Sequence, residues 1–167
     1  MRIEVTLPVN DPARPEQPRL DRAQVWEGLL RKAENAVPFV AGMSQCTVLE
    51  RRENGLLREV VVNGERLREE VTFEPPLLVS FLRRGDRDSW VIRNRIGEDS
   101  TGALTLTFIG DMPHLPSSGT QLAGGRSGEE VLEQMRARML ETVRNTLDVI
   151  RRTTPPPTHT ATAEGDA

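Results

Sequence analysis

Residues 56–73 have the sequence LLREVVVNGERLREEVTF, and this stretch decides the fold class. Apolar residues, many of them β-branched, lie on both sides of Asn63-Gly64. In residues 67–73 they recur at every second position, a period that is typical of a strand with one buried face. Asn-Gly between two such runs is a strong signal for a tight β-hairpin. The stretch therefore predicts two antiparallel strands, residues 56–62 and 66–73.

The neighbouring sequence extends this hairpin into an antiparallel meander. Short apolar runs are separated by the turn residues Glu53–Gly55, Pro75-Pro76, Gly85-Asp86 and Asp99–Gly102. The two prolines must interrupt the strand ladder, because proline has no backbone N–H to donate. The predicted strands are residues 46–50, 56–62, 66–73, 77–83, 89–96 and 103–109.

One further strand and two helices flank the meander. Residues 2–9 alternate between apolar and polar side chains, which predicts the strand. Asp21 with Gln24, and Ser127 with Glu130, have capping-box spacing and predict helices over residues 21–35 and 127–152. At about 1.5 Å per residue the second helix would be roughly 37 Å long, enough to cross the whole sheet. Its apolar stripe comprises Val131, Leu132, Met135, Met139, Val143, Leu147 and Ile150. Between the first helix and the meander, the apolar residues 36–42 predict a second small helix or a turn.

This β-α-α-β6-α order indicates an α+β fold of the helix-grip type. One long helix can cover a curved antiparallel seven-stranded sheet only if the sheet wraps around it. Such wrapping separates sheet from helix in the middle, and the gap predicts an internal cavity. We expect a single domain over residues 1–152, with residues 112–128 as a loop that acts as a lid. The Pro/Thr-rich residues 153–167 are expected to be a disordered tail.

The bulk composition excludes several classes of protein. The chain has 167 residues, of which 37% are hydrophobic and 28% charged, as in a globular domain. A net charge of −3 argues against a nucleic-acid surface, which usually has a basic excess. No apolar run approaches membrane-spanning length, and no signal peptide is evident, so we expect a cytoplasmic protein. Lys32 is the only lysine among 22 Lys and Arg residues, a bias that a GC-rich genome would explain, so we attach no function to it.

Several motifs, in this order, resemble a known family. Its features are found in LPVN (7–10), LDRAQVWEGLLRKAEN (20–35), CTVLERRENGLLREV (46–60), VIRNRI (91–96), GALTLTF (102–108) and TVRNTLDVIRR (142–152). They resemble the AtaL-like family of unknown function, within the SRPBCC superfamily of START, Bet v 1-like and polyketide cyclase domains. The resemblance implies the helix-grip fold and a cavity of ligand size. It implies no established reaction, so no catalytic residue is carried over.

Three polar residues are candidates for the interior of the cavity. Alternation places Glu59, Glu69 and Asn94 on strand faces that are otherwise apolar. A carboxylate in such a place should have a raised pKa, because burial disfavours its charged form, and could act as a general acid or base. The alternative is that the two acids pair with arginines on the outer face and that Asn94 is structural.

The other candidates for ligand binding are apolar. They are Trp26, Phe73, Phe108, Met135 and Met139. Methionine adapts its shape to different ligands, although ordinary core packing is an equally simple explanation of the two methionines. His114 and His159 lie in a loop and in the tail, so no histidine-based catalytic or metal site is predicted, and no cofactor motif is found.

Three functions remain open from the sequence. The first is binding of a small apolar or aromatic molecule without catalysis. The second is a polyketide cyclase or dehydratase-like enzyme that uses Glu69 or Glu59 as acid or base, with Asn94 orienting a carbonyl. The third is an interaction module whose apolar groove binds a partner protein. The first strand could also pair between two chains in a homodimer, although nothing in the sequence requires one.

Overall fold

The computed structural model describes residues 2–84, 89–113 and 125–155, and their arrangement is a curved sheet with two helices on one face. The elements in chain order are β1 (Arg2–Pro8), α1 (Arg22–Glu34), β2 (Met43–Arg52), β3 (Gly55–Val62), β4 (Glu65–Glu74), β5 (Leu78–Arg84), β6 (Ser89–Glu98), β7 (Leu104–Asp111) and α2 (Gly128–Thr153). The predicted fold class and every predicted strand are confirmed.

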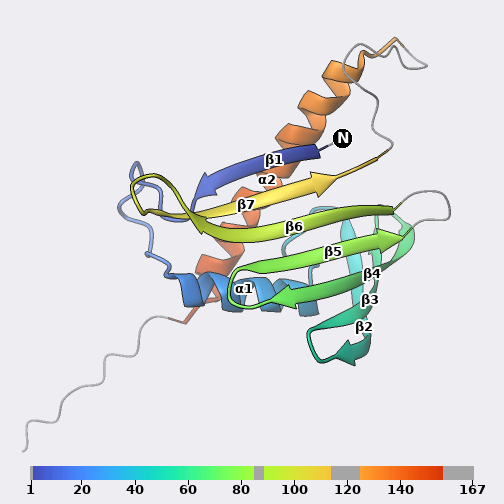
Figure 1. The fold of residues 1–167 in the computed structure, drawn as a ribbon, viewed down its shortest axis with the longest axis horizontal. Coiled ribbons are helices and arrows are strands. Elements are labelled where there is room, and N and C mark those ends of the chain that lie inside the picture. Colours follow the sequence, from blue (N-terminus) through green and yellow to red (C-terminus); the bar gives the residue numbers. More distant parts are fainter. Residues whose placement is uncertain (1, 85–88, 114–124, 156–167) are drawn as a thin grey trace, which may run out of the picture.

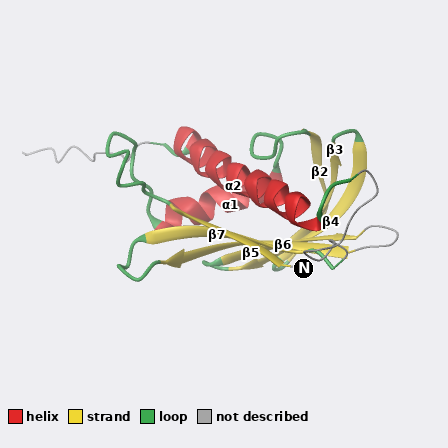
Figure 2. Ribbon diagram, turned by 90° about the horizontal axis from the view of Figure 1, so that it is seen from above, coloured by secondary structure: helices red, strands yellow, loops and turns green. Residues whose placement is uncertain are grey.

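The seven strands form one antiparallel sheet in the order β1-β7-β6-β5-β4-β3-β2. Strands β2 to β7 form the meander, and β1 adds to the edge of β7, so β1 and β2 are the two edge strands (Figure 1). The sheet bends at the β2–β4 end, so these strands rise beside the helices (Figure 2). Pairing of two chains through β1 stays a prediction.

The Asn63-Gly64 turn fixes the register at the centre of the meander. Asn63 and Gly64 both have positive φ angles, as a two-residue hairpin with the favoured twist requires. Val62 therefore pairs with Glu65, and every later pair of β3 and β4 follows from this closure. The same register places Arg58 opposite Glu69.

Both helices begin at the predicted caps. Asp21 accepts a hydrogen bond from the Gln24 backbone N–H, and the Gln24 side chain accepts one from the Asp21 backbone N–H. Ser127 and Glu130 form the same reciprocal pair at the start of α2. Helix α2 crosses the concave face of the sheet, and its first turns extend past β1 (Figure 1). Neither of these two described helices combines the length and the apolar character that a membrane crossing requires.

The second small helix of the expected order is absent from residues 36–42, which form successive turns. Helix α1 ends at Asn35, whose backbone is extended. The Val40 N–H donates to the Ala36 carbonyl at 3.0 Å, which closes a single helical turn. Gly42, with a φ of +81°, then directs the chain into β2. Residues 36–40 therefore complete only one turn before the chain changes direction at Gly42, and no second helix forms.

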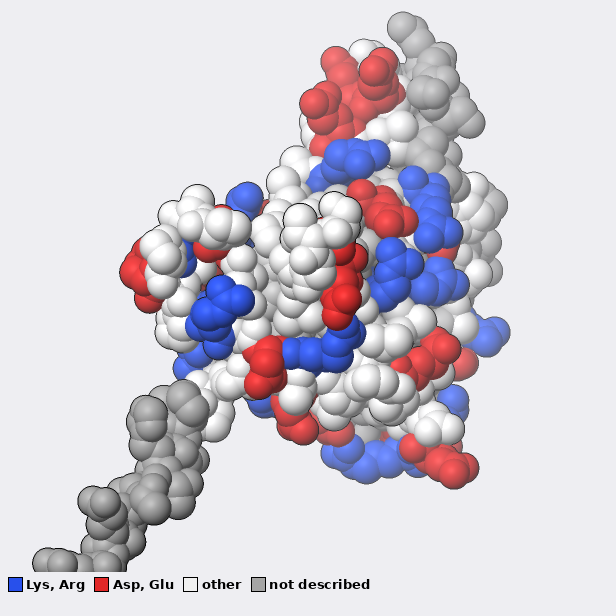
Figure 3. Space-filling view, turned by 60° about the vertical axis from the view of Figure 1, so that its left-hand side comes forward, with Lys and Arg blue, Asp and Glu red and all other residues white. Residues whose placement is uncertain are grey.

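The core lies between the concave face of the sheet and the two helices. Its completely or almost completely buried side chains include Val25 and Leu29 of α1, Phe108 of β7, and Val143 and Ile150 of α2. On the face drawn in Figure 3, acidic and basic side chains are interspersed with neutral surface. Most of the predicted lid, the Gly85-Asp86 turn and most of the predicted tail lie outside the described residues.

Candidate functional site

A pocket of about 280 Å³ lies between the concave face of the sheet and α2. Side chains from both helices and from the six strands β2–β7 line it. Most of its wall is apolar, and Phe81, Trp90, Ile92, Phe108, Met135 and Met139 are among the lining residues. The polar residues Lys32, Arg58, Glu69 and Arg83 also line it.

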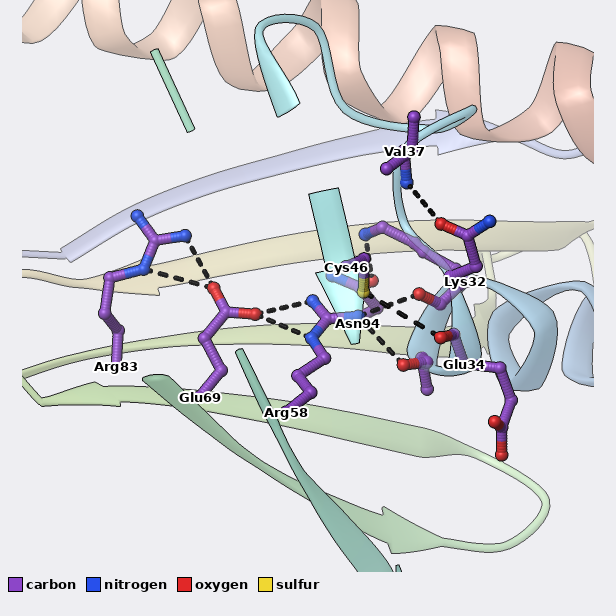
Figure 4. A network of polar contacts seen from close by, with 10 residues as sticks. Lys32, Glu34, Val37, Cys46, Arg58, Glu69, Arg83 and Asn94 are labelled. Atoms are coloured by element: carbon purple, nitrogen blue, oxygen red, sulfur yellow. Dashed lines mark hydrogen bonds and ion pairs between the residues drawn. The ribbon is translucent and has the colours of Figure 1, made fainter. Parts of the chain in front are cut away.

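The register of three neighbouring strands builds a row of charged side chains across the sheet. Arg58 of β3 lies opposite Glu69 of β4, and Glu69 lies opposite Arg83 of β5. Directly opposite residues in an antiparallel sheet project from the same face. Figure 4 accordingly shows Glu69 between the two guanidinium groups.

Each guanidinium takes one oxygen of the Glu69 carboxylate. Arg58 donates from Nε at 2.8 Å and from Nη2 at 2.6 Å, both to Oε2. Arg83 donates from Nε at 3.1 Å, and from Nη2, to Oε1. Arg58 and Glu69 are buried, with 2% and 4% of their surfaces exposed.

The pKa of Glu69 differs in direction from the prediction. Burial alone would raise it, but the charges and hydrogen bonds of Arg58 and Arg83 outweigh burial and hold the pKa below its ordinary value. The expectation of a raised carboxylate pKa was therefore wrong. Glu69 stays ionised at neutral pH and has no proton to donate as an acid.

Arg58 also connects the sheet to the end of α1. Its Nη1 donates to the carbonyl oxygens of Lys32 and Ala33, both at 2.9 Å. These carbonyls belong to the last turn of the helix, where no further backbone N–H within the helix can reach them. A buried side chain of β3 satisfies them instead.

Lys32, in the last turn of α1, projects from the helix towards the sheet and into this site. Its Nζ donates to Asn94 Oδ1 at 2.7 Å, and it lies 4.3 Å from the centre of the Phe108 ring and 5.0 Å from that of Phe81. Lys32 is 4% exposed. Burial, and to a smaller extent the Arg58 charge, lower the pKa of this amine from the ordinary 10.5 to about 7, although Glu69 opposes the change.

The side-chain amide of Asn94, in β6, forms a hydrogen bond through its oxygen but not through its nitrogen among the described residues. Its Oδ1 accepts from Lys32, but its Nδ2 is buried and has no hydrogen-bond partner among the described residues. A buried donor without an acceptor costs about 1–3 kcal/mol. An oxygen atom of a bound molecule would remove this cost.

The structure brings part of the predicted site together. Glu69, Phe108, Met135 and Met139 line the pocket. Asn94 is buried beside it, through its contact with Lys32. Trp26 and Phe73 are half-buried, pack against the hydrophobic core and do not line the pocket.

The prediction that Glu59 lies in the cavity was wrong, because its side chain projects from the opposite face of the sheet. There it forms ion pairs with Arg66 and Arg68, which is the outer-face alternative. In β3 both faces carry apolar residues together with one charged residue, so alternation alone did not distinguish them. The two-residue turn does so, because it pairs position 58 with position 69 and therefore places Glu59 on the other face.

Lys32, Arg58 and Arg83 line the pocket but were not predicted as site residues from the sequence. The turn register just described would have placed Arg58 with Glu69. Lys32 carried a simpler signal, because a chain that uses arginine everywhere else has its one lysine there. Arg83 follows from the pairing of β4 with β5, whose register the Pro75-Pro76 connection did not make predictable.

The described residues contain no group of three or more His, Cys, Asp or Glu side chains that could hold a metal ion. Among the described residues, the polar groups that line the pocket are one amine, three guanidinium groups, one carboxylate and one hydroxyl. Arg138 and Thr142 of α2 supply the third guanidinium group and the hydroxyl, and the Asn94 amide lies beside them.

The family model for acetylaranotin biosynthesis cluster protein L (AtaL) matches residues 3–155. The chain belongs to the AtaL family. No curated protein matches it.

Solved structures show that this AtaL-family chain shares its fold with two aromatase/cyclases and with Ara h 8.0201. The Zhui aromatase/cyclase from Streptomyces sp. R1128 is 16% identical, with a TM-score of 0.60 over 91% of this chain and 94% of that one. The di-domain aromatase/cyclase StfQ of the steffimycin biosynthetic pathway is 11% identical, with a TM-score of 0.64 over 90% of this chain. The chain spans 50% of the length of StfQ. Ara h 8.0201 is 7% identical, with a TM-score of 0.54 over 90% of this chain and 97% of that one.

Proposed function

We propose that the chain binds a small, mostly apolar or aromatic molecule in the pocket between α2 and the sheet. The observation that carries this proposal is the combination of an apolar wall with a few polar side chains, among them the buried amine of Lys32, in one pocket. Ligand pockets typically combine such walls with a few polar groups that orient the ligand. Phe81, Trp90 and Phe108 supply flat apolar surface, and Lys32, which donates to Asn94 beside the pocket, supplies a hydrogen-bonding group in the wall.

The fold neighbours support the proposal in general terms. Zhui and StfQ are described as aromatase/cyclases, and StfQ comes from the steffimycin biosynthetic pathway. Because the sequence identities are 16% or less, these comparisons support a shared fold and do not identify the ligand of this chain.

A cyclase or dehydratase-like enzyme is the second candidate, and one observation favours it. The Lys32 amine lies at the pocket with a pKa lowered to about 7 by burial, which suits a group that exchanges protons at neutral pH. In this candidate the amine takes the place of the carboxylates Glu59 and Glu69. An interaction module receives less support, because Leu49 and Leu77 are the large apolar side chains that the described part of the chain exposes.

Ligand-observed NMR with a library of one- and two-ring aromatic compounds tests the binding proposal. Met135→Trp places a large ring at the pocket wall, and Ala137→Trp makes the same change at an exposed position of α2. We expect Met135→Trp to weaken binding by roughly tenfold or more, because the new ring occupies ligand volume, and Ala137→Trp to leave binding unchanged. If no compound binds the wild-type chain, or if both variants bind equally well, the proposal fails.

A further inference from the structure

Lys32 is an amine at a position where charge pairing does not require one. The Glu69 carboxylate is already paired with Arg58 and Arg83, and among the described residues the partner of Lys32 is the neutral amide of Asn94. Every other basic side chain of the Lys/Arg type is arginine. Arginine is the usual residue for buried ion pairs, whereas lysine differs in that it can lose its proton and become a nucleophile.

The surroundings of Lys32 favour the uncharged amine. The side chain is buried, and Arg58 places a second positive charge nearby, although the Phe81 and Phe108 rings and Glu69 favour the cation. Desolvation in an apolar pocket and a neighbouring cation are the two conditions that activate amines for attack on carbonyl groups. Both conditions are present at one nitrogen.

Asn94 positions the Lys32 amine from beside the pocket. Its Oδ1 accepts one N–H of Lys32 and so fixes the position of the amine. Its Nδ2, bonded to the same carbon atom as Oδ1, is the buried donor without a partner.

We propose that Lys32 forms an imine with an aldehyde or ketone bound in the pocket. The amine nitrogen adds to the carbonyl carbon, and one N–H proton passes to the oxygen to give a carbinolamine. The hydroxyl then leaves with a second proton as water, and a C=N bond replaces the C=O bond. The balance is one carbonyl compound and one amine giving one imine and one water. This inference rests on the proposed binding function and names the class of ligand, a carbonyl compound with an apolar body.

Reductive trapping tests the inference directly. The chain is incubated with 2-naphthaldehyde and sodium cyanoborohydride at several pH values, and the reduced adduct is located by mass spectrometry of the intact chain and its peptides. Lys32 and the N-terminal amine are the two ordinary amines of the sequence, so the N-terminus serves as an internal reference. We expect the adduct on Lys32 to form at neutral pH roughly tenfold faster or more than on free lysine, because more of the amine is uncharged.

Two variants separate reactivity from charge. Lys32→Arg keeps a cation but removes the nucleophile, and should give no adduct at position 32. Asn94→Asp places a carboxylate against the amine, which should move the pH at which trapping is half-maximal upwards from about 7. A midpoint that stays at about 7 in Asn94→Asp would show that the trapped amine is not the one that Asn94 contacts.

Binding of 2-methylnaphthalene, measured by NMR on the same sample, distinguishes the two possible failures. If this carbonyl-free analogue binds but the aldehyde gives no adduct on Lys32, the imine inference is overturned and the binding proposal stands. Labelling confined to the N-terminus has the same meaning. If neither compound binds, both proposals fail.

Discussion

Glu69 and Glu59 allow a matched comparison of two carboxylates on neighbouring strands. Each is paired with two arginines, but Glu69 is buried against the helices and Glu59 lies on the outer face. Glu69→Gln should lower the free energy of unfolding by about 3–5 kcal/mol, because it leaves buried guanidinium charge without a counter-charge. Glu59→Gln should lower it by less than about 1 kcal/mol, as for exposed pairs. Urea denaturation monitored by tryptophan fluorescence measures both, and equal losses would contradict the assignment of faces.

The contribution of Glu69 should also appear in the way the free energy of unfolding changes at acidic pH. The folded-state pKa of Glu69 lies below its ordinary 4.5, so its contribution to stability is present above pH 4.5 and is lost as the pH falls further. The Glu69→Gln variant should therefore lose less stability than the wild type when the pH is lowered through this range. Parallel urea titrations at several acidic pH values test this expectation.

Lys32 should also make stability rise with pH, but in a higher pH window than Glu69. Its pKa is about 7 in the folded chain and 10.5 when exposed, so the unfolded chain binds more protons between these values. The free energy of unfolding should then rise with pH in this window by up to about 1.4 kcal/mol per pH unit, relative to Lys32→Met, which has no proton to bind. Urea titrations between pH 7 and 9 measure the two slopes, and parallel slopes would show that Lys32 titrates as an exposed lysine does.

The sequence predicted the placement of some site residues but not of others, and the difference has a physical reason. Glu69 was placed correctly because its strand alternates clearly, whereas its pKa was predicted in the wrong direction. The direction depends on the charges of Arg58 and then Arg83, and Arg83 reaches the carboxylate only through the pairing of β4 with β5. Lys32 could not be placed, because its pocket is built by residues from elements far apart in the sequence.

At the scale of elements, local signals were sufficient where local chemistry decides the structure. Both helix starts follow from cap residues within three positions of each other, and the β3–β4 hairpin follows from Asn63-Gly64. The residues 36–42 were ambiguous because their apolar character fits both a buried turn and a helix.

The contact between the two helices gives an element-scale prediction. A Cβ atom added to Gly28 of α1 would lie 2.4 Å from Cγ1 of Ile150 in α2, so the helices approach each other too closely for a larger residue. Gly28→Ala should therefore lower the free energy of unfolding by about 1–3 kcal/mol through overpacking, less what alanine contributes to the helix.

Ile150→Ala provides the control for this effect. In that background the added methyl group has space, so Gly28→Ala should be neutral or stabilising, with a coupling of about 0.5–3 kcal/mol between the two sites. A double-mutant cycle by urea denaturation measures the coupling. Additive effects would mean that the helices adjust their separation freely.

At the scale of the whole molecule, the order of elements predicted the curved sheet around α2, but the size of the pocket needed the structure. Gly110 shows why. It lies opposite Ile92 and has no side chain, and the methyl groups of Met112 and Met139 lie where its Cβ would be, within 2.9 Å. Such local contacts determine how much of the space between sheet and helix stays open, and no sequence period encodes them.

The volume of the pocket predicts a size limit for ligands. About 280 Å³ is at the lower end of the range of ligand pockets, about 300–1,000 Å³. One- and two-ring compounds should bind more tightly than three-ring compounds, and Met135→Ala should move this limit towards larger rings. Affinities for a series of such compounds, measured by NMR titration, test the limit, which would be wrong if the wild type bound three-ring compounds best.

Side chains of two strands hold the end of α1 against the sheet. Arg58 satisfies two of its last carbonyls, and the Cys46 thiol lies 3.8 Å from a third, that of Glu34 (Figure 4). Helix ends commonly fray, but this one cannot open without releasing the side chain that also holds Glu69. The backbone amides of the last turn of α1 should therefore exchange with deuterium in the same cooperative step as those of β3 and β4. A ligand that draws Lys32 towards itself would act on these contacts, so its binding should change exchange along β3 and β4 at residues outside the pocket as well as at those that line it.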